Sequence, residues 1–184
     1  MRLCIFCGSK TGDDPRFSQA AVEIGTLLAQ RGIGVVYGGG RVGLMGILAD
    51  AARAAGGEVI GVIPQSLAER EVAHSDLTQL HVVDTMHERK ALMAELSAGF
   101  IALPGGFGTL EEFCEVITWS QLGIHSKPCG ILNVAGYFDN LIGMFDYAVE
   151  HGFISEANRE IVLESTQPAE LIERMLTLTE VGLR

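Results

Sequence analysis

Glycines, a hydroxyl and carboxylates crowd one short segment of the chain, residues 104–112, with the sequence PGGFGTLEE. The segment follows an apolar run and opens a helical pattern, so Gly105, Gly106 and Gly108 let the backbone come close to a phosphate. A helix that begins here adds unpaired N–H groups and a partial positive charge, and Thr109 is placed to cap it and to donate its hydroxyl. The spacing therefore predicts a site for a small anion.

The carboxylates of this turn have two interpretations. Residues 109–112 match the T-x-x-E capping box, in which Glu112 would only accept a hydrogen bond from the Thr109 N–H. A cap needs one carboxylate, whereas Glu111, Glu112 and Glu115 all lie within about one turn. A carboxylate beside a sugar can stabilise the positive charge that develops when a glycosidic bond breaks, and it can activate water. The presence of more carboxylates than a cap needs favours a chemical role, and Glu112 is the candidate for it.

Cations that could balance an anion are scarce, because 13 Lys and Arg face 23 Asp and Glu, for a net charge of −10. This balance argues against nucleic-acid binding, which needs clustered cations. Arg89 and Lys90 are adjacent in residues 86–90, at the start of a predicted helix. Neighbouring helical positions diverge by about 100°, so one cation can hold phosphate while the other steers a leaving base. A solvated pair is the alternative.

The elements that must position these residues alternate along the chain. Short β-rich apolar runs predict strands at 2–6, 34–37, 58–63, 79–83, 99–103, 128–132 and 161–163. Apolar residues at i, i+3 and i+4 predict helices at 17–30, 44–55, 86–97, 110–121, 137–151 and 169–178. This order is typical of an α/β protein, a doubly wound parallel sheet with helices on both faces. The 184 residues suit a single Rossmann-like domain over 1–184.

Ligands of such sheets bind beyond the carboxyl ends of the strands. That edge holds Ser9 after the first strand, Gly39 and Gly40 after the second, and Met86 after the fourth, all of which become candidate substrate contacts. Residues 38–43 also match G-x-G-x-x-G, but an NAD site wants an acidic residue after the next strand, which ends in Pro64 instead. We therefore expect some of these glycines to serve a tight turn that packs the next helix on the sheet.

Other features of the composition exclude further classes of protein. The irregular spacing of Cys4, Cys7, Cys114 and Cys129 predicts buried small side chains, not a zinc site or disulfide. The five histidines lack metal-ligand spacing, so we expect them at the surface or behind the site. The apolar start is too short for a signal peptide, and no run reaches the roughly 20 residues that span a bilayer. We expect a soluble cytoplasmic protein.

Residues 104–112, taken with 86–90, resemble the Lonely Guy family of cytokinin-activating phosphoribohydrolases, whose members are often labelled lysine decarboxylases. The motif P-G-G-x-G-T-x-x-E is matched at every fixed position. Further matches extend the resemblance over most of the chain, at residues 6–9, 37–40, 43–46 and 118–125. The resemblance implies a homodimeric Rossmann-like enzyme that needs no metal or organic cofactor. Its substrates would be N6-modified adenosine 5′-monophosphates, and AMP, cleaved to free base and ribose 5-phosphate.

The resemblance also implies roles for single positions. Arg89 and Glu112 match the catalytic pair of the family. Substrate contacts correspond to Glu71, Lys90, Gly105, Gly106, Phe107, Gly108, Thr109, Leu110, Glu111 and Thr118. Lys10 stands where the family commonly has a second serine, so the first loop departs from the family pattern.

Two other functions are alternatives to this enzyme. A pyridoxal phosphate decarboxylase needs a Schiff-base lysine and a partner for the pyridine nitrogen, and Lys90 with a phosphate loop does not supply both. The second alternative is a non-catalytic carrier of a phosphate-bearing, nucleotide-like cofactor. Molybdenum-cofactor carriers resemble this fold and share the phosphate loop. The pair of Arg89 and Glu112 favours the enzyme. An apolar stripe on 110–121 that includes Trp119 is interpreted as a subunit interface.

Overall fold

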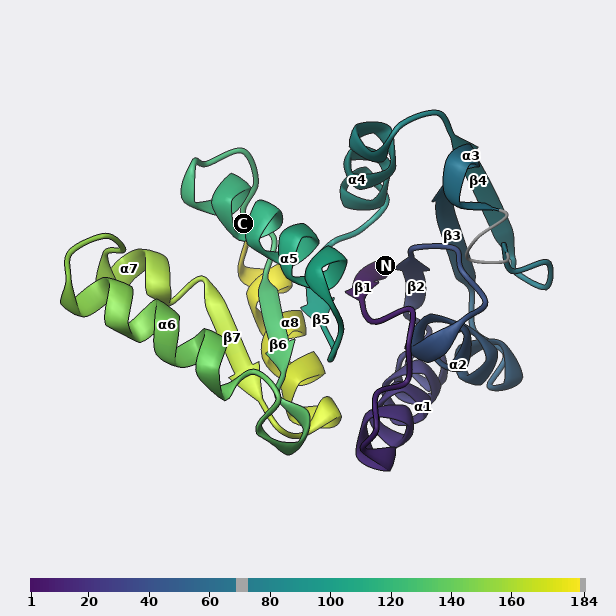
Figure 1. Ribbon diagram of the computed structural model, residues 1–184, viewed down its shortest axis with the longest axis horizontal. Coiled ribbons are helices and arrows are strands. Elements are labelled where there is room, and N and C mark those ends of the chain that lie inside the picture. The colour runs from purple at the N-terminus through teal and green to yellow at the C-terminus, as the bar shows by residue number, and fades with distance from the viewer. Residues whose placement is uncertain (69–72, 183–184) are drawn as a thin grey trace.

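The computed structural model describes residues 1–68 and 73–182 of the chain. Within them seven strands form one sheet in the order β4-β3-β2-β1-β5-β6-β7, and each neighbouring pair is parallel (Figure 1). The strands are β1 (Arg2–Phe6), β2 (Gly34–Tyr37), β3 (Val59–Pro64), β4 (Gln79–Val83), β5 (Phe100–Ala102), β6 (Cys129–Leu132) and β7 (Val162–Ser165). The predicted doubly wound parallel sheet is confirmed.

Helices connect the strands in nearly the predicted ranges. They are α1 (Pro15–Gln30), α2 (Gly43–Ala54), α3 (Gln65–Ala68), α4 (Met86–Glu95), α5 (Phe107–Gln121), η1 (Val134–Gly136), α6 (Asp139–Glu150), α7 (Glu156–Arg159) and α8 (Pro168–Gly182). Local signals explain where they start. Pro15 occupies the first turn of α1 and the Asp14 carboxylate accepts the Arg16 N–H, so the helix begins with a proline and a side-chain cap.

The two faces of the sheet carry separate apolar cores. Successive residues of a strand point to opposite faces, so Leu3 and Ile5 of β1 join one core while Cys4 and Phe6 join the other. The first core packs under α1, α2 and α8, and the second packs under α4, α5 and α6. Within the described ranges, no helix combines the length and apolarity needed to cross a bilayer.

The strand order reverses between β1 and β5, which are neighbours in the sheet although β2, β3 and β4 lie between them in the chain. The chain leaves β1 toward β2 on one side and leaves β5 toward β6 on the other, so the loops after β1 and β5 diverge. Such a switch point opens a crevice at the carboxyl edge of the sheet. The Gly8 N–H donates to the Pro104 carbonyl at 3.0 Å and fixes the two loops side by side.

Candidate active site

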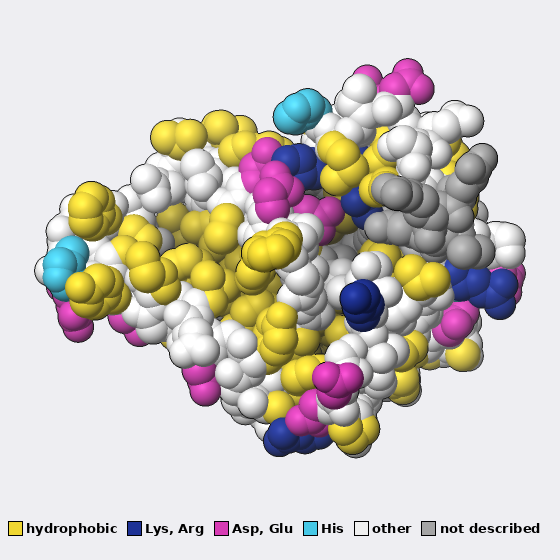
Figure 2. All heavy atoms as spheres, viewed as in Figure 1, with side chains coloured by type: hydrophobic (Ala, Val, Ile, Leu, Met, Phe, Trp, Pro, Cys, Tyr) yellow, Lys and Arg dark blue, Asp and Glu magenta, His cyan; other side chains and the backbone are white. Residues whose placement is uncertain are grey.

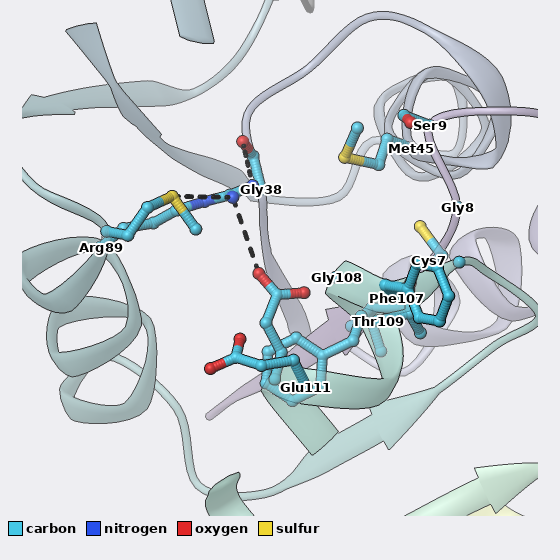
Figure 3. A pocket seen from close by; sticks show the side chains of 15 residues that line it. Cys7, Gly8, Ser9, Gly38, Met45, Arg89, Phe107, Gly108, Thr109 and Glu111 are labelled. Atoms are coloured by element: carbon cyan, nitrogen blue, oxygen red, sulfur yellow. Dashed lines mark hydrogen bonds and ion pairs between the residues drawn. The ribbon is translucent and has the colours of Figure 1, made fainter. Parts of the chain in front are cut away.

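A cavity of about 220 Å³ lies at this switch point, between the loop after β1, the end of β2 and the first turns of α2, α4 and α5. It gathers nine of the residues expected from the sequence: Ser9, Met86, Arg89, Gly106, Phe107, Gly108, Thr109, Glu111 and Glu112. Figure 3 shows Arg89 entering from α4, while Phe107, Thr109 and Glu111 lie across from it on α5. Segments far apart in the sequence therefore meet in one cavity.

The Arg89 guanidinium is held by backbone carbonyls at the ends of two strands. Its Nε donates to the Val62 carbonyl at 3.1 Å, and its Nη2 donates to the Gly38 carbonyl at 3.0 Å. Its Nη1 lies 3.6 Å from Oε1 of Glu112, a separation typical of an ion pair and longer than a hydrogen bond. Both residues are almost fully buried, so each charge compensates the other in a site where an unpaired charge would be costly.

Glu112 does not cap its helix, so the capping-box interpretation of residues 109–112 is wrong. The helix α5 begins at Phe107, with Gly106 as its N-cap, and this places Thr109 and Glu112 inside the helix. The first intrahelical bond runs from the Leu110 N–H to the Gly106 carbonyl. A capping box does exist at Thr85 and Glu88, where the Thr85 hydroxyl accepts the Glu88 N–H at 3.1 Å and Glu88 accepts the Thr85 N–H at 3.3 Å. The Glu112 carboxylate therefore faces the cavity and Arg89.

The prediction that Thr109 caps α5 is also wrong. Its side chain is buried beneath Gly105, where the Thr109 hydroxyl takes up the space that a Cβ on Gly105 would need. The structure has no side-chain cap on α5 among the described residues. The first-turn N–H groups and the positive end of the helix therefore border the cavity, which is the arrangement that binds anions.

Lys90 has different partners from those that the sequence suggested. Its ammonium lies 2.5 Å from Glu111 and 3.0 Å from Glu115, and it joins α4 to α5 beside the cavity. Burial opposes the charge, but the hydrogen bonds to the two carboxylates outweigh it and raise the pKa of Lys90. A Schiff-base lysine needs a neutral amine. The charged and occupied Lys90 does not fit the lysine of a pyridoxal phosphate enzyme.

Other predicted contacts lie further from this cavity. Gly39 packs on β3 and its carbonyl accepts the His74 N–H, while Gly40 pairs with Ala73. Gly105 borders a neighbouring cavity instead, and Leu110 packs against the core. The Thr118 hydroxyl, further along α5, donates to the Cys114 carbonyl of the same helix. Glu71 lies outside the described residues.

Six lining residues were not among the predicted site residues: Ile5, Phe6, Cys7, Gly8, Gly38 and Met45. Gly38 contributes its backbone carbonyl to Arg89, and a backbone contact of this kind cannot be predicted from the residue type. Cys7 directly follows β1, within residues 6–9, which match the family pattern. Burial, reinforced by the negative charge of Glu112, raises the pKa of the Cys7 thiol. The thiol therefore stays protonated and does not compete as a nucleophile.

Most of the cysteines are buried and most of the histidines are not, as the sequence predicted. Cys4, Cys7 and Cys129 are buried and free, and Cys114 is half-buried. No cluster of metal ligands occurs among the described residues. His74 is the exception, because it is buried and not at the surface. Its Nε2 lies 3.0 Å from Asp50, and its Nδ1 accepts the Asp76 N–H, so two polar partners stabilise it inside the protein.

Comparison with known sequences finds one family model and similar proteins from plants. Residues 45–175 match a family model described as possible lysine decarboxylase. Cytokinin riboside 5′-monophosphate phosphoribohydrolase LOG1 of Arabidopsis thaliana is 50% identical over 174 residues, which cover 95% of this chain and 82% of the plant protein. The enzyme of that name, LOG, from Oryza sativa subsp. japonica is 50% identical over 185 residues, covering 99% of this chain and 76% of the rice protein.

Solved structures share the fold at lower sequence identity. The molybdenum cofactor binding protein of Rippkaea orientalis has a TM-score of 0.72 and 23% identity, covering 96% of each chain. The molybdenum cofactor carrier protein of Chlamydomonas reinhardtii has a TM-score of 0.73 and 19% identity, again over 96% of each chain. At these identities the likeness extends to the fold alone.

Proposed function

The chain belongs to the possible lysine decarboxylase family and, within it, to the cytokinin riboside 5′-monophosphate phosphoribohydrolases, and we propose that it hydrolyses the N-glycosidic bond of N6-modified adenosine 5′-monophosphates. The products are the free base and ribose 5-phosphate, and AMP is a substrate as well. The observation that carries this proposal is the buried pair of Arg89 and Glu112 beside the open N-terminus of α5. One side of the cavity suits a phosphate, and the other suits a developing sugar cation.

The phosphate anchor is the first part of the mechanism. The 5′-phosphate binds the N–H groups around Gly106, Phe107, Gly108 and Thr109, where the helix dipole supplies positive charge in an otherwise acidic protein. Phosphate binding fixes the ribose in the cavity, so binding energy gained away from the reacting bond supports the chemical step. Nucleosides without the phosphate should react poorly.

Glu112 and Arg89 act on the reacting bond. As the bond from C1′ to the base nitrogen breaks, its electrons leave with the base, and positive charge builds on the sugar. The Glu112 carboxylate stabilises this charge and takes a proton from the water whose hydroxide adds to C1′. Glu112 then releases this proton, and the departing base takes one up at its nitrogen, so that the free base forms. The Nη1 edge of Arg89, which the two strand carbonyls leave facing Glu112, stabilises the departing base.

We further propose that the protein acts as a homodimer. Figure 2 shows hydrophobic side chains gathered over the end of the molecule formed by α5, α6 and α7. Leu122 and Ile124 after α5, Met144 and Tyr147 on α6, and Phe153 after α6 are all more than half exposed. Exposed apolar faces of this kind are typical of subunit interfaces. Phe153→Asp should convert the dimer to a monomer in size-exclusion chromatography with light scattering, whereas an unchanged mass would exclude this face.

A cytoplasmic location belongs to the same proposal. The cysteines are free, as expected in a reducing compartment. Fractionation of cells that express the tagged protein tests it, and recovery in the secreted or membrane fraction would contradict it.

The reaction is tested with a panel of small molecules. The purified protein is incubated with AMP, isopentenyl-AMP, adenosine and CMP, and the released bases are identified by chromatography. We expect base release from the two adenosine monophosphates and little from adenosine. Tight binding of the monophosphates without cleavage would instead indicate a carrier.

A further inference from the structure

Two carbonyl groups of the glycine loop accept hydrogen bonds from other segments of the chain. The Pro104 carbonyl accepts the Gly8 N–H at 3.0 Å, and the Gly105 carbonyl accepts the Tyr137 hydroxyl. The Tyr137 ring borders a second cavity of about 350 Å³ on that side of the loop, which Gly105 and Gly106 also line. Both carbonyls before α5 are therefore tied to donors from other parts of the chain.

The geometry of the peptide bond gives this contact a consequence. In a trans peptide the C=O and the N–H point in opposite directions. With the Gly105 carbonyl tied to Tyr137, the Gly106 N–H of the same peptide points away from Tyr137, and Gly106 lines the cavity that holds Arg89. The hydroxyl of Tyr137 thus sets the direction of an N–H group that it never touches.

Tyr137 is itself held in place by its neighbours. It follows a turn in which Ala135 has φ = 56°, the one positive φ outside glycine among the described residues. A residue with a Cβ adopts this conformation only when the surroundings enforce it. Asn133 stabilises the turn by accepting the Phe138 N–H at 2.8 Å. The Tyr137 ring also packs edge-on against Phe17 and Phe138, at 5.5 and 4.9 Å between ring centroids.

We propose that Tyr137 is a positioning residue for phosphate recognition, whose hydroxyl fixes the Gly105–Gly106 peptide with its N–H toward the anion. Two successive glycines rotate freely, so this peptide would otherwise flip easily. A flipped peptide presents its carbonyl oxygen to the phosphate and repels it. This inference rests on the proposed function for the identity of the anion.

The test removes only the hydroxyl. Dissociation constants of AMP and adenosine are measured by calorimetry in a Glu112→Gln background, which is expected to bind AMP without cleaving it. The background protein is compared with its Tyr137→Phe and Thr177→Val derivatives. Thr177→Val is the control because it removes an exposed hydroxyl on α8 that donates to a backbone carbonyl, that of Glu173. Loss of one oriented hydrogen bond should weaken AMP binding by about tenfold in Tyr137→Phe and leave adenosine binding unchanged. Thr177→Val should bind both like the background protein.

Other outcomes overturn the inference. Equal weakening of AMP and adenosine binding in Tyr137→Phe would reduce the residue to general packing, and no weakening would mean that the peptide is oriented without it. Phe17→Leu loosens the ring but keeps the hydroxyl, so it should preserve the ratio of the two affinities, and it remains informative if Tyr137→Phe fails to fold. If wild-type protein binds AMP without cleaving it, the proposed function fails while this binding test still decides the role of Tyr137.

Discussion

Two glycine-rich loops lead from a strand into a helix at the same edge of the sheet, yet only one is open to a ligand. The loop of residues 38–43, before α2, is filled by the protein itself. The N–H groups of Leu44 and Met45 both point to the Gly8 carbonyl, which already occupies the N-terminus of this helix. A Cβ on Gly43 would lie 2.3 Å from the backbone of Ser9 and Lys10. These glycines serve close backbone packing.

The glycine-rich turn of residues 104–108, which runs into the first turn of α5, differs in its surroundings. A Cβ on Gly106 or Gly108 would meet no described atom within 4 Å, and among the described residues no side chain caps the helix. Gly105 is packed tightly against Thr109, but the glycines after it face the cavity. A glycine-rich strand-to-helix turn is thus a phosphate site only when the rest of the fold leaves its N–H groups unoccupied.

The largest expected effect comes from removing the carboxylate beside the open loop. Glu112→Gln should lower the rate of adenine release from AMP by about 10² to 10⁴, because it cannot stabilise a sugar cation or take a proton. Calorimetry should still detect AMP binding. Glu88→Gln is the matched control, since Glu88 belongs to the true capping box and should retain activity within a few-fold. Normal turnover by Glu112→Gln would show that the carboxylate beside the open loop takes no part in the reaction.

The closed loop should respond to a methyl group by losing stability. A Cβ on Gly46, in the first turns of α2, would lie 2.0 Å from the Arg41 carbonyl oxygen. Gly46→Ala should therefore lower the free energy of unfolding by about 1–3 kcal/mol, as measured by urea denaturation. Stability equal to that of the wild type would mean that this loop is not filled as described.

The open loop should show the opposite response to the same substitution. Gly108→Ala places its methyl in free space, so the thermal midpoint should stay at or slightly above that of the wild type. The methyl intrudes where the phosphate approaches, and KM for AMP should rise by about tenfold. Unchanged kinetics in a stable Gly108→Ala protein would place the phosphate elsewhere.

The smallest effect concerns the ion pairs behind the open loop. The pKa of Lys90 is raised in the folded protein, so its stabilisation is complete below the ordinary value of 10.5 and is lost as the pH rises through the higher folded value. Urea denaturation between neutral and strongly alkaline pH should show a steeper loss of stability in the wild type than in Lys90→Met. Identical pH profiles would show that Glu111 and Glu115 do not stabilise the ammonium.

Sequence reasoning assembled much of the candidate site because the signals for its elements are local. The alternation of short apolar runs with helical periodicity predicted the parallel sheet, and parallel strands bring their carboxyl ends to one edge. Arg89, Glu112 and the glycines of residues 104–108 therefore had to lie near that edge. The start of α5 was predicted three residues late, since its N-cap is Gly106, which supplies no capping side chain. That error led to the mistaken cap at Thr109, and it made the capping box of residues 109–112 an alternative interpretation of Glu112.

The sequence by itself determined the alternation of elements, the edge that carries the site and the residue types that can perform the chemistry. Only the tertiary structure decided which glycine loop is open, which carbonyls orient Arg89 and which carboxylates form ion pairs with Lys90. Arg89 is 51 residues from Gly38 and 27 from Val62, and Lys90 is 21 from Glu111. Periodicity and caps act over a few residues, whereas these contacts form between segments that meet only when the whole sheet is assembled.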